Sequence, residues 1–193
     1  MRVLTHFALW TVGLAQASTM YTEAECMCLE RHGAGRRRPV EIGCWHGVNT
    51  RRLRRVMAPD GVLRAVDPYA PGQLGFSAHR IIARREVDKE QNGTVQWVRM
   101  TDLEAARHLA ADGPFDLIFS DSLNTFEGYR ATWDAWHPLL ASGGVYLLPN
   151  SRSSPTRNLD DVGSARCTRE VILQDGRFNV IDVVDTFTVL RRS

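Results

Sequence analysis

The chain has 193 residues, a formal net charge of +2 and 44% hydrophobic residues. This length suits a single domain with a sizeable core, and the composition is that of a globular protein. So small a charge gives no basis for a nucleic acid partner, and no segment approaches the roughly 20 unbroken apolar residues of a membrane span. We therefore expect one domain over residues 1–193, without a nucleic acid or membrane partner.

The four cysteines are Cys26, Cys28, Cys44 and Cys167. Cys26 and Cys28 are separated by one residue, and no second pair completes the spacing of a zinc site. Thiols in this arrangement are typical of a reducing compartment. We therefore expect a cytoplasmic protein whose cysteines are structural.

The N-terminus has a pattern with two interpretations. Arg2, an apolar run over residues 3–14 and the tripeptide Ala15-Gln16-Ala17 imitate a secretion signal and its cleavage site. Polar residues at positions 5, 6 and 11 interrupt the run, and a single basic residue precedes it, which disfavours secretion. We expect instead that residues 1–35 form a helical segment ahead of a core over residues 36–193.

The expected elements follow from the spacing of apolar residues and from cap and turn signals. Thr22 and Glu25 form a capping-box pattern that predicts a helix over residues 22–32. Apolar runs predict strands over residues 39–42, 62–66, 95–100, 115–120, 145–148, 178–184 and 186–190. Helical spacing predicts further helices from residue 49 or 50, over 76–87, from 101, over 126–140 and over 163–173.

Strands and helices alternate along most of the chain, which predicts an α/β fold with a doubly wound, Rossmann-like sheet of seven mostly parallel strands. The last two strands are joined too tightly for a helical crossover, so we expect a C-terminal antiparallel hairpin. Asp67, Thr101, Asp121 and Asn150 each follow or end a predicted strand. The carboxyl ends of parallel strands meet at one edge of the sheet and bind ligands there, so we expect these residues to lie together.

The turn after the first strand reads Glu41-Ile42-Gly43-Cys44-Trp45-His46-Gly47. Its glycines allow a ligand to approach the backbone, and Asp67, after the next strand, can accept hydrogen bonds from ribose hydroxyls. This combination favours a nucleoside, and the acid at Glu41 favours a cationic or zwitterionic ligand over a pyrophosphate. The glycine turn alone is weak evidence, because the same pattern also serves as a tight turn without a ligand.

The stretch from Glu41 to Gly47 resembles motif I of the class I S-adenosylmethionine-dependent methyltransferases. Residues 115–121, 126–129, 136, 138–140 and 143–145 are similar to the small bacterial group called methyltransferase family 24, and the likeness extends from Thr19 to the C-terminus. The resemblance implies S-adenosylmethionine as cofactor and methyl transfer to a small-molecule acceptor, with a hydroxyl oxygen preferred. It also implies that the N-terminal segment folds over a nucleoside-binding core as a lid.

Carried over residue by residue, the resemblance implies cofactor contacts from Glu41, Gly43, Cys44, Trp45, Gly47, Thr50, Asp67, Pro68, Tyr69, Thr101, Asp102, Asp121 and Ser122. Substrate contacts are expected from Tyr21, Asn124, Asn150 and Arg152. A hydroxyl must lose its proton as the methyl group arrives, and the candidate bases are Asp121 and His46. His46 has an alternative role as a packing residue beside the cofactor.

The chain departs from the family where catalysis is expected. Relatives usually carry Asp-Gly-Asp-His after the fourth strand and often His-Asp after the fifth, whereas this chain has Asp121-Ser122-Leu123-Asn124 and Pro149-Asn150. Asp121 and Asn150 alone make a poor magnesium site, so no divalent metal is expected. The departures leave open N-methylation, another reaction on the same scaffold, or a cofactor-binding protein with a degenerate catalytic end. A homodimer is compatible with the sequence.

Overall fold

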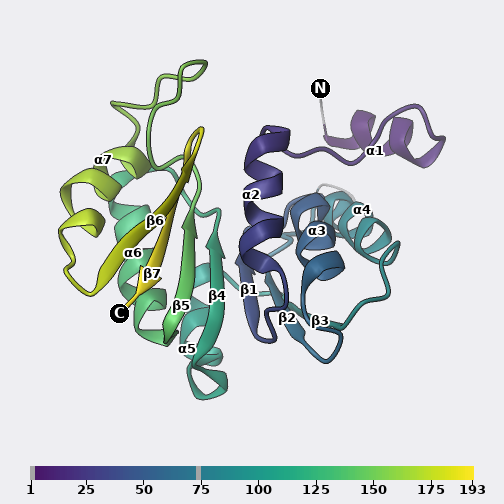
Figure 1. Ribbon diagram of the computed structural model, residues 1–193. Helices are drawn as coiled ribbons and strands as arrows, with labels where there is room; N and C mark the ends of the chain where they lie inside the picture. Colours follow the sequence, from purple (N-terminus) through teal and green to yellow (C-terminus); the bar gives the residue numbers. More distant parts are fainter. Residues whose placement is uncertain (1–2, 73–74) are drawn as a thin grey trace.

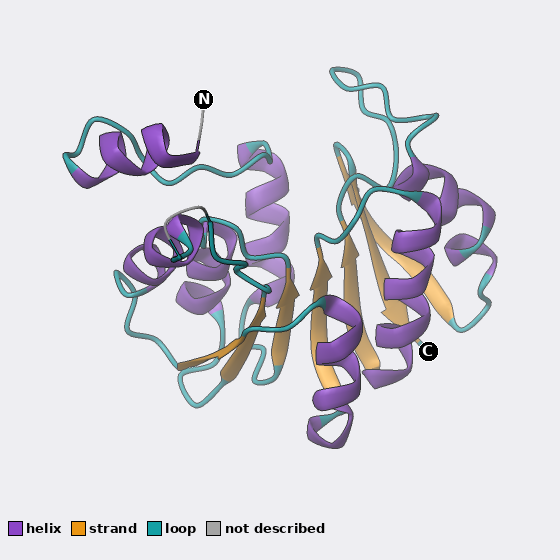
Figure 2. Ribbon diagram, turned by 180° about the vertical axis from the view of Figure 1, so that it is seen from behind, coloured by secondary structure: helices purple, strands orange, loops and turns teal. Residues whose placement is uncertain are grey.

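The computed structural model describes residues 3–72 and 75–193. They form one seven-stranded sheet with helices on both faces (Figures 1 and 2). The strands are β1 (Pro39–Ile42), β2 (Val62–Val66), β3 (Thr94–Val98), β4 (Phe115–Ser120), β5 (Leu140–Leu148), β6 (Phe178–Val184) and β7 (Phe187–Arg192). Their order is β3-β2-β1-β4-β5-β7-β6. Strands β1 to β5 run parallel, and β7 runs antiparallel to both β5 and β6, which confirms the predicted fold class.

Helices pack on both sides of this sheet. The α-helices are α1 (Val3–Thr11), α2 (Glu23–Gly33), α3 (Val48–Val56), α4 (Ala78–Val87), α5 (Asp102–His108), α6 (Phe126–Trp136) and α7 (Gly163–Glu170). Helices α2, α3 and α4 lie on one face of the sheet, and α5, α6 and α7 lie on the other (Figure 1). Each group supplies the buried helix residues of its own face.

Alternation along each strand divides the core between the two faces. In β1, Val40 and Ile42 join the apolar cluster on the side of α5 to α7, which includes the fully buried Trp136. The second cluster, on the side of α2 and α3, includes Leu29. Glu41 lies between Val40 and Ile42, so its carboxyl group points toward this second side and into the interior.

Strand β5 begins earlier than predicted, because Ser142-Gly143-Gly144 is part of the strand and not a turn ahead of it. Phe115 of β4 pairs with Leu140, whereas Leu117, two residues further along β4, pairs with Val145, five residues further along β5. The additional residues of β5 therefore form a bulge opposite β4. A bulge absorbs such residues while the strand continues on both sides of it.

Two helices are shorter than predicted. The α-helix expected over residues 126–140 ends at Trp136, because Pro138 has no backbone N–H to donate and Leu140 already belongs to β5. The helix expected over residues 163–173 ends at Glu170. A 3-10 turn follows each of them, at His137–Leu139 and Ile172–Gln174. The remaining boundaries differ from the expected ones by at most two residues.

The apolar N-terminal run forms helix α1, which lies on the surface against α4 (Figure 1). The Trp10 ring lies under the Arg85 guanidinium at 5.4 Å, and the Phe7 ring packs against Phe76 at 5.7 Å. Arg2, which belongs to the signal-like pattern, lies outside the described residues. Within residues 3–72 and 75–193, no helix combines the length and the apolar character that a membrane crossing requires.

Helix α2 differs from α1, since it is built into the core of the domain. Cys28 and Leu29 are fully buried in the cluster beneath it. The segment expected over residues 1–35 therefore consists of a surface helix, a connecting stretch and a core helix. All four cysteines are buried free thiols.

Glu25 ties the start of α2 to the C-terminal hairpin. Its Oε2 accepts a hydrogen bond from the Thr22 N–H at 2.9 Å, and its Oε1 accepts one from the Thr186 N–H at 2.9 Å. The residue is 1% exposed. We expect Glu25→Ala to lower the free energy of unfolding by about 3 kcal/mol, because it leaves buried donors without acceptors. Urea denaturation measures this loss.

Glu104→Ala is a matched control for Glu25→Ala. Glu104 completes the second capping box of the chain, with Thr101 at the start of α5, but it is exposed to solvent. Water can satisfy the donors that this variant frees, so its loss of stability should be much smaller. Equal losses in the two variants would contradict the role assigned to burial.

Candidate functional site

The glycine turn after β1 lies directly against the end of β4. Gly43 has a φ of +84° and Gly47 a φ of +74°, in the left-handed region that glycine tolerates best. A Cβ atom on Gly43 would lie 2.1 Å from the backbone oxygen of Asp121. The absence of a side chain at Gly43 therefore allows β1 and β4 to bring the turn and Asp121 together.

Asp67 holds the glycine turn in place. Its Oδ2 accepts hydrogen bonds from the N–H groups of Cys44 at 3.1 Å and Trp45 at 3.0 Å, and its Oδ1 accepts one from the Tyr69 N–H at 2.8 Å. A carboxylate offers about four lone-pair positions, so these three donors leave little additional capacity. Asp67 is thus a positioning group for the turn as well as a possible ligand for a hydroxyl.

Glu41 is the most unusual group of the site. It is fully buried, and neither carboxylate oxygen has a hydrogen-bond partner among residues 3–72 and 75–193. Burial raises its pKa to about 8; the nearby Thr50 hydroxyl partly opposes the rise, and the carboxylates of Asp121 and Asp67 add to it. A buried acid without a partner is costly, and a bound cation would offset that cost.

Asp121 follows β4, on the other side of the turn. Burial raises its pKa to about 6, while the Tyr21 hydroxyl and the positive charge of Arg157 partly oppose the rise. The Tyr21 ring is held edge-on against Phe187 at 4.9 Å, next to β4 and β7. The structure therefore places an acid that is largely ionised at neutral pH beside a phenol hydroxyl.

The N-terminal connecting stretch forms one wall of a pocket of about 100 Å³. The residues that line this pocket are Ser18, Thr19, Met20, Tyr21, Gly43, Cys44, Trp45, Val48, Asn49 and Asp121. They come from the stretch before α2, the glycine turn, the start of α3 and the end of β4. Residues that the sequence assigns to a lid and to a cofactor turn therefore face one pocket.

His46 is buried in an aromatic stack rather than aimed into this pocket as a free base. Its ring stacks on Trp45 at 4.1 Å and on His6 at 4.9 Å, and His79 meets it edge-on at 5.1 Å. The Ser18 N–H donates to His46 Nδ1 at 3.3 Å. Burial, followed by the two other histidines, lowers the pKa of His46 to about 4, so the ring is neutral. These contacts support the packing alternative for His46.

Several other predicted residues have buried polar atoms without a hydrogen-bond partner within the described part of the chain: Thr50, Tyr69, Ser122 and Asn150. Asn150 also has a φ of +51°, and its carbonyl oxygen accepts a hydrogen bond from the Ser164 hydroxyl at 2.7 Å. The carbonyl oxygen of Asn124 accepts a bond from the Ser164 N–H at 3.1 Å. Ser164 therefore joins the loops that follow β4 and β5.

Other members of the predicted set have structural contacts of their own. Thr101 caps α5, and the Asp102 carboxylate accepts a hydrogen bond from the buried Thr132 hydroxyl. Tyr69 packs into a small apolar cluster beside α4, while Pro68 is exposed next to it. These residues lie near the edge of the sheet where the strands end, but their side chains do not line the pocket of the glycine turn.

Arg152 lies away from the glycine turn. It lines a different cavity of about 360 Å³, together with Arg169 of α7 and Val180 of β6. Arg157, from the same loop, is the basic residue whose charge acts on Asp121. Arg157 is therefore the arginine of this loop whose charge reaches Asp121, and the substrate contact expected from Arg152 stays a prediction. The conformation of the loop determines which of the two arginines acts on Asp121, and the spacing of residues in the sequence does not predict that conformation.

The seven-stranded sheet and the polar ends of its parallel strands define an α/β domain of the Rossmann-like class. The chain belongs to methyltransferase family 24, since residues 40–150 match the family model described as a methyltransferase domain. No curated protein sequence matches the chain.

Solved structures share the fold at low sequence identity. A protein from Corynebacterium glutamicum is 19% identical, with a TM-score of 0.69 over 99% of this chain and 89% of its own. An O-methyltransferase from Bacillus cereus, in complex with SAH, is 19% identical, with a TM-score of 0.63 over 98% and 89%. The N-methyltransferase NodS from Bradyrhizobium japonicum, in complex with S-adenosyl-L-homocysteine, is 15% identical, with a TM-score of 0.62 over 98% and 96%.

Proposed function

We propose that this protein binds S-adenosylmethionine and transfers its methyl group to a small-molecule acceptor, with a hydroxyl oxygen as the preferred acceptor atom. Membership of a methyltransferase family supports the class of reaction. Solved neighbours that carry the cofactor product include both an O- and an N-methyltransferase, so fold alone does not decide the acceptor.

The observation that carries this proposal is the buried Glu41 carboxyl without a partner, next to the glycine turn. S-adenosylmethionine has a cationic amino group and a sulfonium centre, and either would favour the ionised form of Glu41 and provide the counter-charge for it. The ribose would lie near Asp67, which has about one acceptor position left after its backbone contacts. The residues present therefore fit this cofactor.

When bound, S-adenosylmethionine supplies an electrophilic methyl group. The chain would supply alignment and a proton acceptor. Asp121 has a pKa of about 6, so it is mostly ionised at pH 7 and can take the proton from an acceptor hydroxyl. Tyr21 and the stretch before α2 would cover the pocket and keep water out, which is the lid role proposed for this segment.

A cofactor-binding protein without turnover is the second candidate. The residues after Asp121 are Ser122, Leu123 and Asn124, and none of them is an acid. Leu123, which is 68% exposed, and Asn124 also face solvent, so this segment brings no second acid into the pocket. Incubation with the labelled cofactor and a panel of phenols, sugars and amines separates the candidates. Methyl transfer to any of them supports the enzyme, and cofactor binding without transfer supports the second candidate.

Calorimetric titration with S-adenosylmethionine and S-adenosylhomocysteine tests cofactor binding directly. We expect wild-type protein to bind both and Asp67→Ala to weaken binding by roughly 100-fold, because it removes the acceptor that positions the turn along with a contact for the ribose. Failure of the wild-type protein to bind either compound would overturn the proposed function and its alternative.

Asp116→Ala is the matched control for Asp67→Ala. Asp116 lies in β4, and its carboxylate accepts hydrogen bonds from the N–H groups of Arg37 and Arg38, at 2.7 and 3.1 Å. It therefore also holds backbone donors, but at the opposite end of the sheet from the glycine turn. The Asp116→Ala variant should be less stable than the wild-type protein but should bind the cofactor with wild-type affinity.

A further inference from the structure

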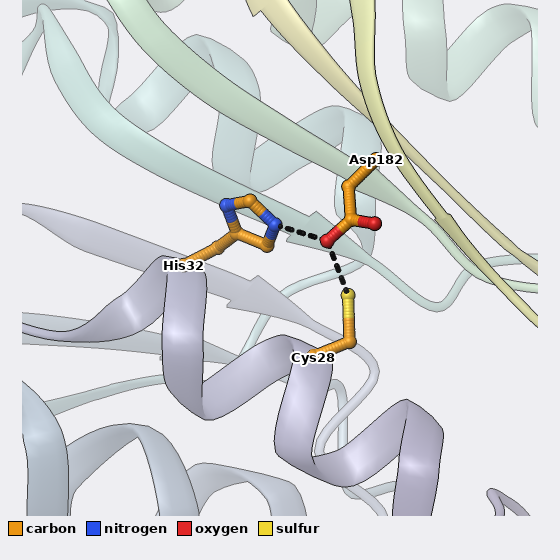
Figure 3. Close-up of side chains that lie close together, drawn as sticks. All are labelled: Cys28, His32 and Asp182. Atoms are coloured by element: carbon orange, nitrogen blue, oxygen red, sulfur yellow. Dashed lines mark hydrogen bonds and ion pairs between the residues drawn. The ribbon is translucent and has the colours of Figure 1, made fainter.

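Three side chains of types that can ligate a metal meet between α2 and β6, away from the glycine turn (Figure 3). Cys28 and His32 are one helical turn apart on α2 and lie on the same face of it. Asp182 of β6 faces them, although it lies 150 residues further along the chain than His32. The thiol, the imidazole nitrogen and a carboxylate oxygen all lie within 4.8 Å of one another.

We propose that Cys28, His32 and Asp182 bind a divalent transition-metal ion of the zinc type. Asp182 Oδ2 lies 2.9 Å from His32 Nε2 and 3.9 Å from Cys28 Sγ. Ligand atoms around a tetrahedral zinc ion are separated by roughly 3.3–3.8 Å, as its bond lengths of about 2.0–2.3 Å require. Small side-chain shifts therefore convert the observed cluster into a three-ligand site.

The chemistry of the three ligands favours zinc over magnesium or calcium. A thiolate and an imidazole are the ligands that zinc selects, whereas magnesium and calcium require oxygen atoms. The Val183 N–H donates to Asp182 Oδ1 at 2.9 Å, which orients the carboxylate and leaves Oδ2 directed at the cluster. Such support of a ligand from a neighbouring donor is typical of metal sites.

The surroundings of the cluster allow an ion to enter. Cys28 is fully buried, whereas the side chains of His32 and Asp182 are 15% and 24% exposed. The fourth coordination position would therefore face solvent and take a water molecule. On binding, the Cys28 thiol releases its proton to solvent as the sulfur–metal bond forms. Arg31 now pairs with Asp182, but its side chain is 58% exposed and can turn into water.

An ion at this site would link α2 to the C-terminal hairpin. The start of α2 is already joined to that hairpin, because the Thr22 hydroxyl donates to Asp185 at 2.7 Å and Glu25 accepts from Thr186. One to two turns further along the helix, where Asp182 already pairs with His32 and Arg31, the proposed ion would add metal–ligand bonds between α2 and β6. It would stabilise the domain without touching the pocket of the glycine turn.

Titration of the full-length, chelator-treated protein with Co²⁺ and Zn²⁺ tests the site. We expect one equivalent of Co²⁺ to bind with a thiolate-to-cobalt charge-transfer band, and Zn²⁺ to displace it. Zn²⁺ at a hundredfold excess over its Kd should raise Tm by about 5 °C or more. Cys28→Ala should abolish the band, and Asp182→Asn and His32→Gln should weaken metal binding by roughly 100-fold or more.

Cys26→Ala is the matched control, since Cys26 is also buried in α2 but lies outside the cluster. The Cys26→Ala variant should keep the thiolate-to-cobalt band and the wild-type affinity for the metal. Circular dichroism shows whether each variant is folded, and His32→Gln, at a partly exposed position, decides the case if Cys28→Ala does not fold. Lack of a thiolate band in the wild-type protein, or equal losses in Cys26→Ala and His32→Gln, would show that the cluster is only a hydrogen-bond network.

Discussion

Replacement of Gly43 by alanine is expected to abolish cofactor binding and to lower the free energy of unfolding by about 4 kcal/mol. Two separate costs contribute. The φ of +84° costs an L-residue roughly 1–2 kcal/mol, and overpacking adds roughly 1–3 kcal/mol. The added Cβ would lie 2.1 Å from the backbone oxygen of Asp121, so no side-chain rotation relieves the clash.

The clash can be relieved only by separating β1 from the end of β4. That movement would carry Asp121 away from the glycine turn and open the pocket that both of them line. The loss of affinity should therefore accompany the loss of stability. Urea denaturation and calorimetric titration measure the two effects on the same preparation.

Gly143→Ala separates backbone strain from crowding. Gly143 has a φ of +75°, close to that of Gly43, but no heavy atom of the described chain lies within 4 Å of the Cβ that would be added. This variant should lose only about 1 kcal/mol and bind the cofactor normally. If Gly43→Ala loses no more than Gly143→Ala, the close approach of the two strand ends has been misassigned.

The fold and the glycine turn could be predicted from the sequence because their signals are local. Apolar runs of four to six residues identify β1, β2 and β4, and the short connection between β6 and β7 requires an antiparallel pair. The glycines at 43 and 47 mark backbone that other residues avoid. In each case the residues whose pattern predicts a strand or a turn are the residues that form it.

Features that depend on partners far apart in the chain were less predictable. The bulge at Ser142-Gly143-Gly144 is set by the pairing of β5 with β4, so the sequence alone suggests a turn. His6 stacks on His46 from α1 and His79 meets it edge-on from α4, and nothing in their spacing predicts these contacts. The interval between Cys28 and His32 is visible in the sequence, but Asp182 reaches them only through the order of the sheet.

Asp121→Asn is expected to reduce the rate of methyl transfer to a hydroxyl acceptor by about 100- to 10,000-fold. An amide cannot take the proton that the acceptor loses. In the wild-type protein the rate should fall as the pH falls through about 6, because only the ionised carboxylate of Asp121 acts as a base. The variant should lack this decline, and its affinity for the cofactor should change far less than its rate.

Asp121 also affects the stability of the protein, and this effect can be measured without a methyl acceptor. Burial raises the pKa of Asp121 from 3.8 to about 6, so between these pH values the folded protein holds a proton that the unfolded chain releases. The free energy of unfolding should therefore decrease as the pH rises through this window, and Asp121→Asn should remove that part of the decrease. Asp116→Asn, at the other end of β4, is the control and should keep it. If Asp121→Asn kept the wild-type pH profile of either rate or stability, Asp121 would be excluded as the buried base. Methyl transfer would then have to rely on an acceptor acidic enough to lose its proton unaided.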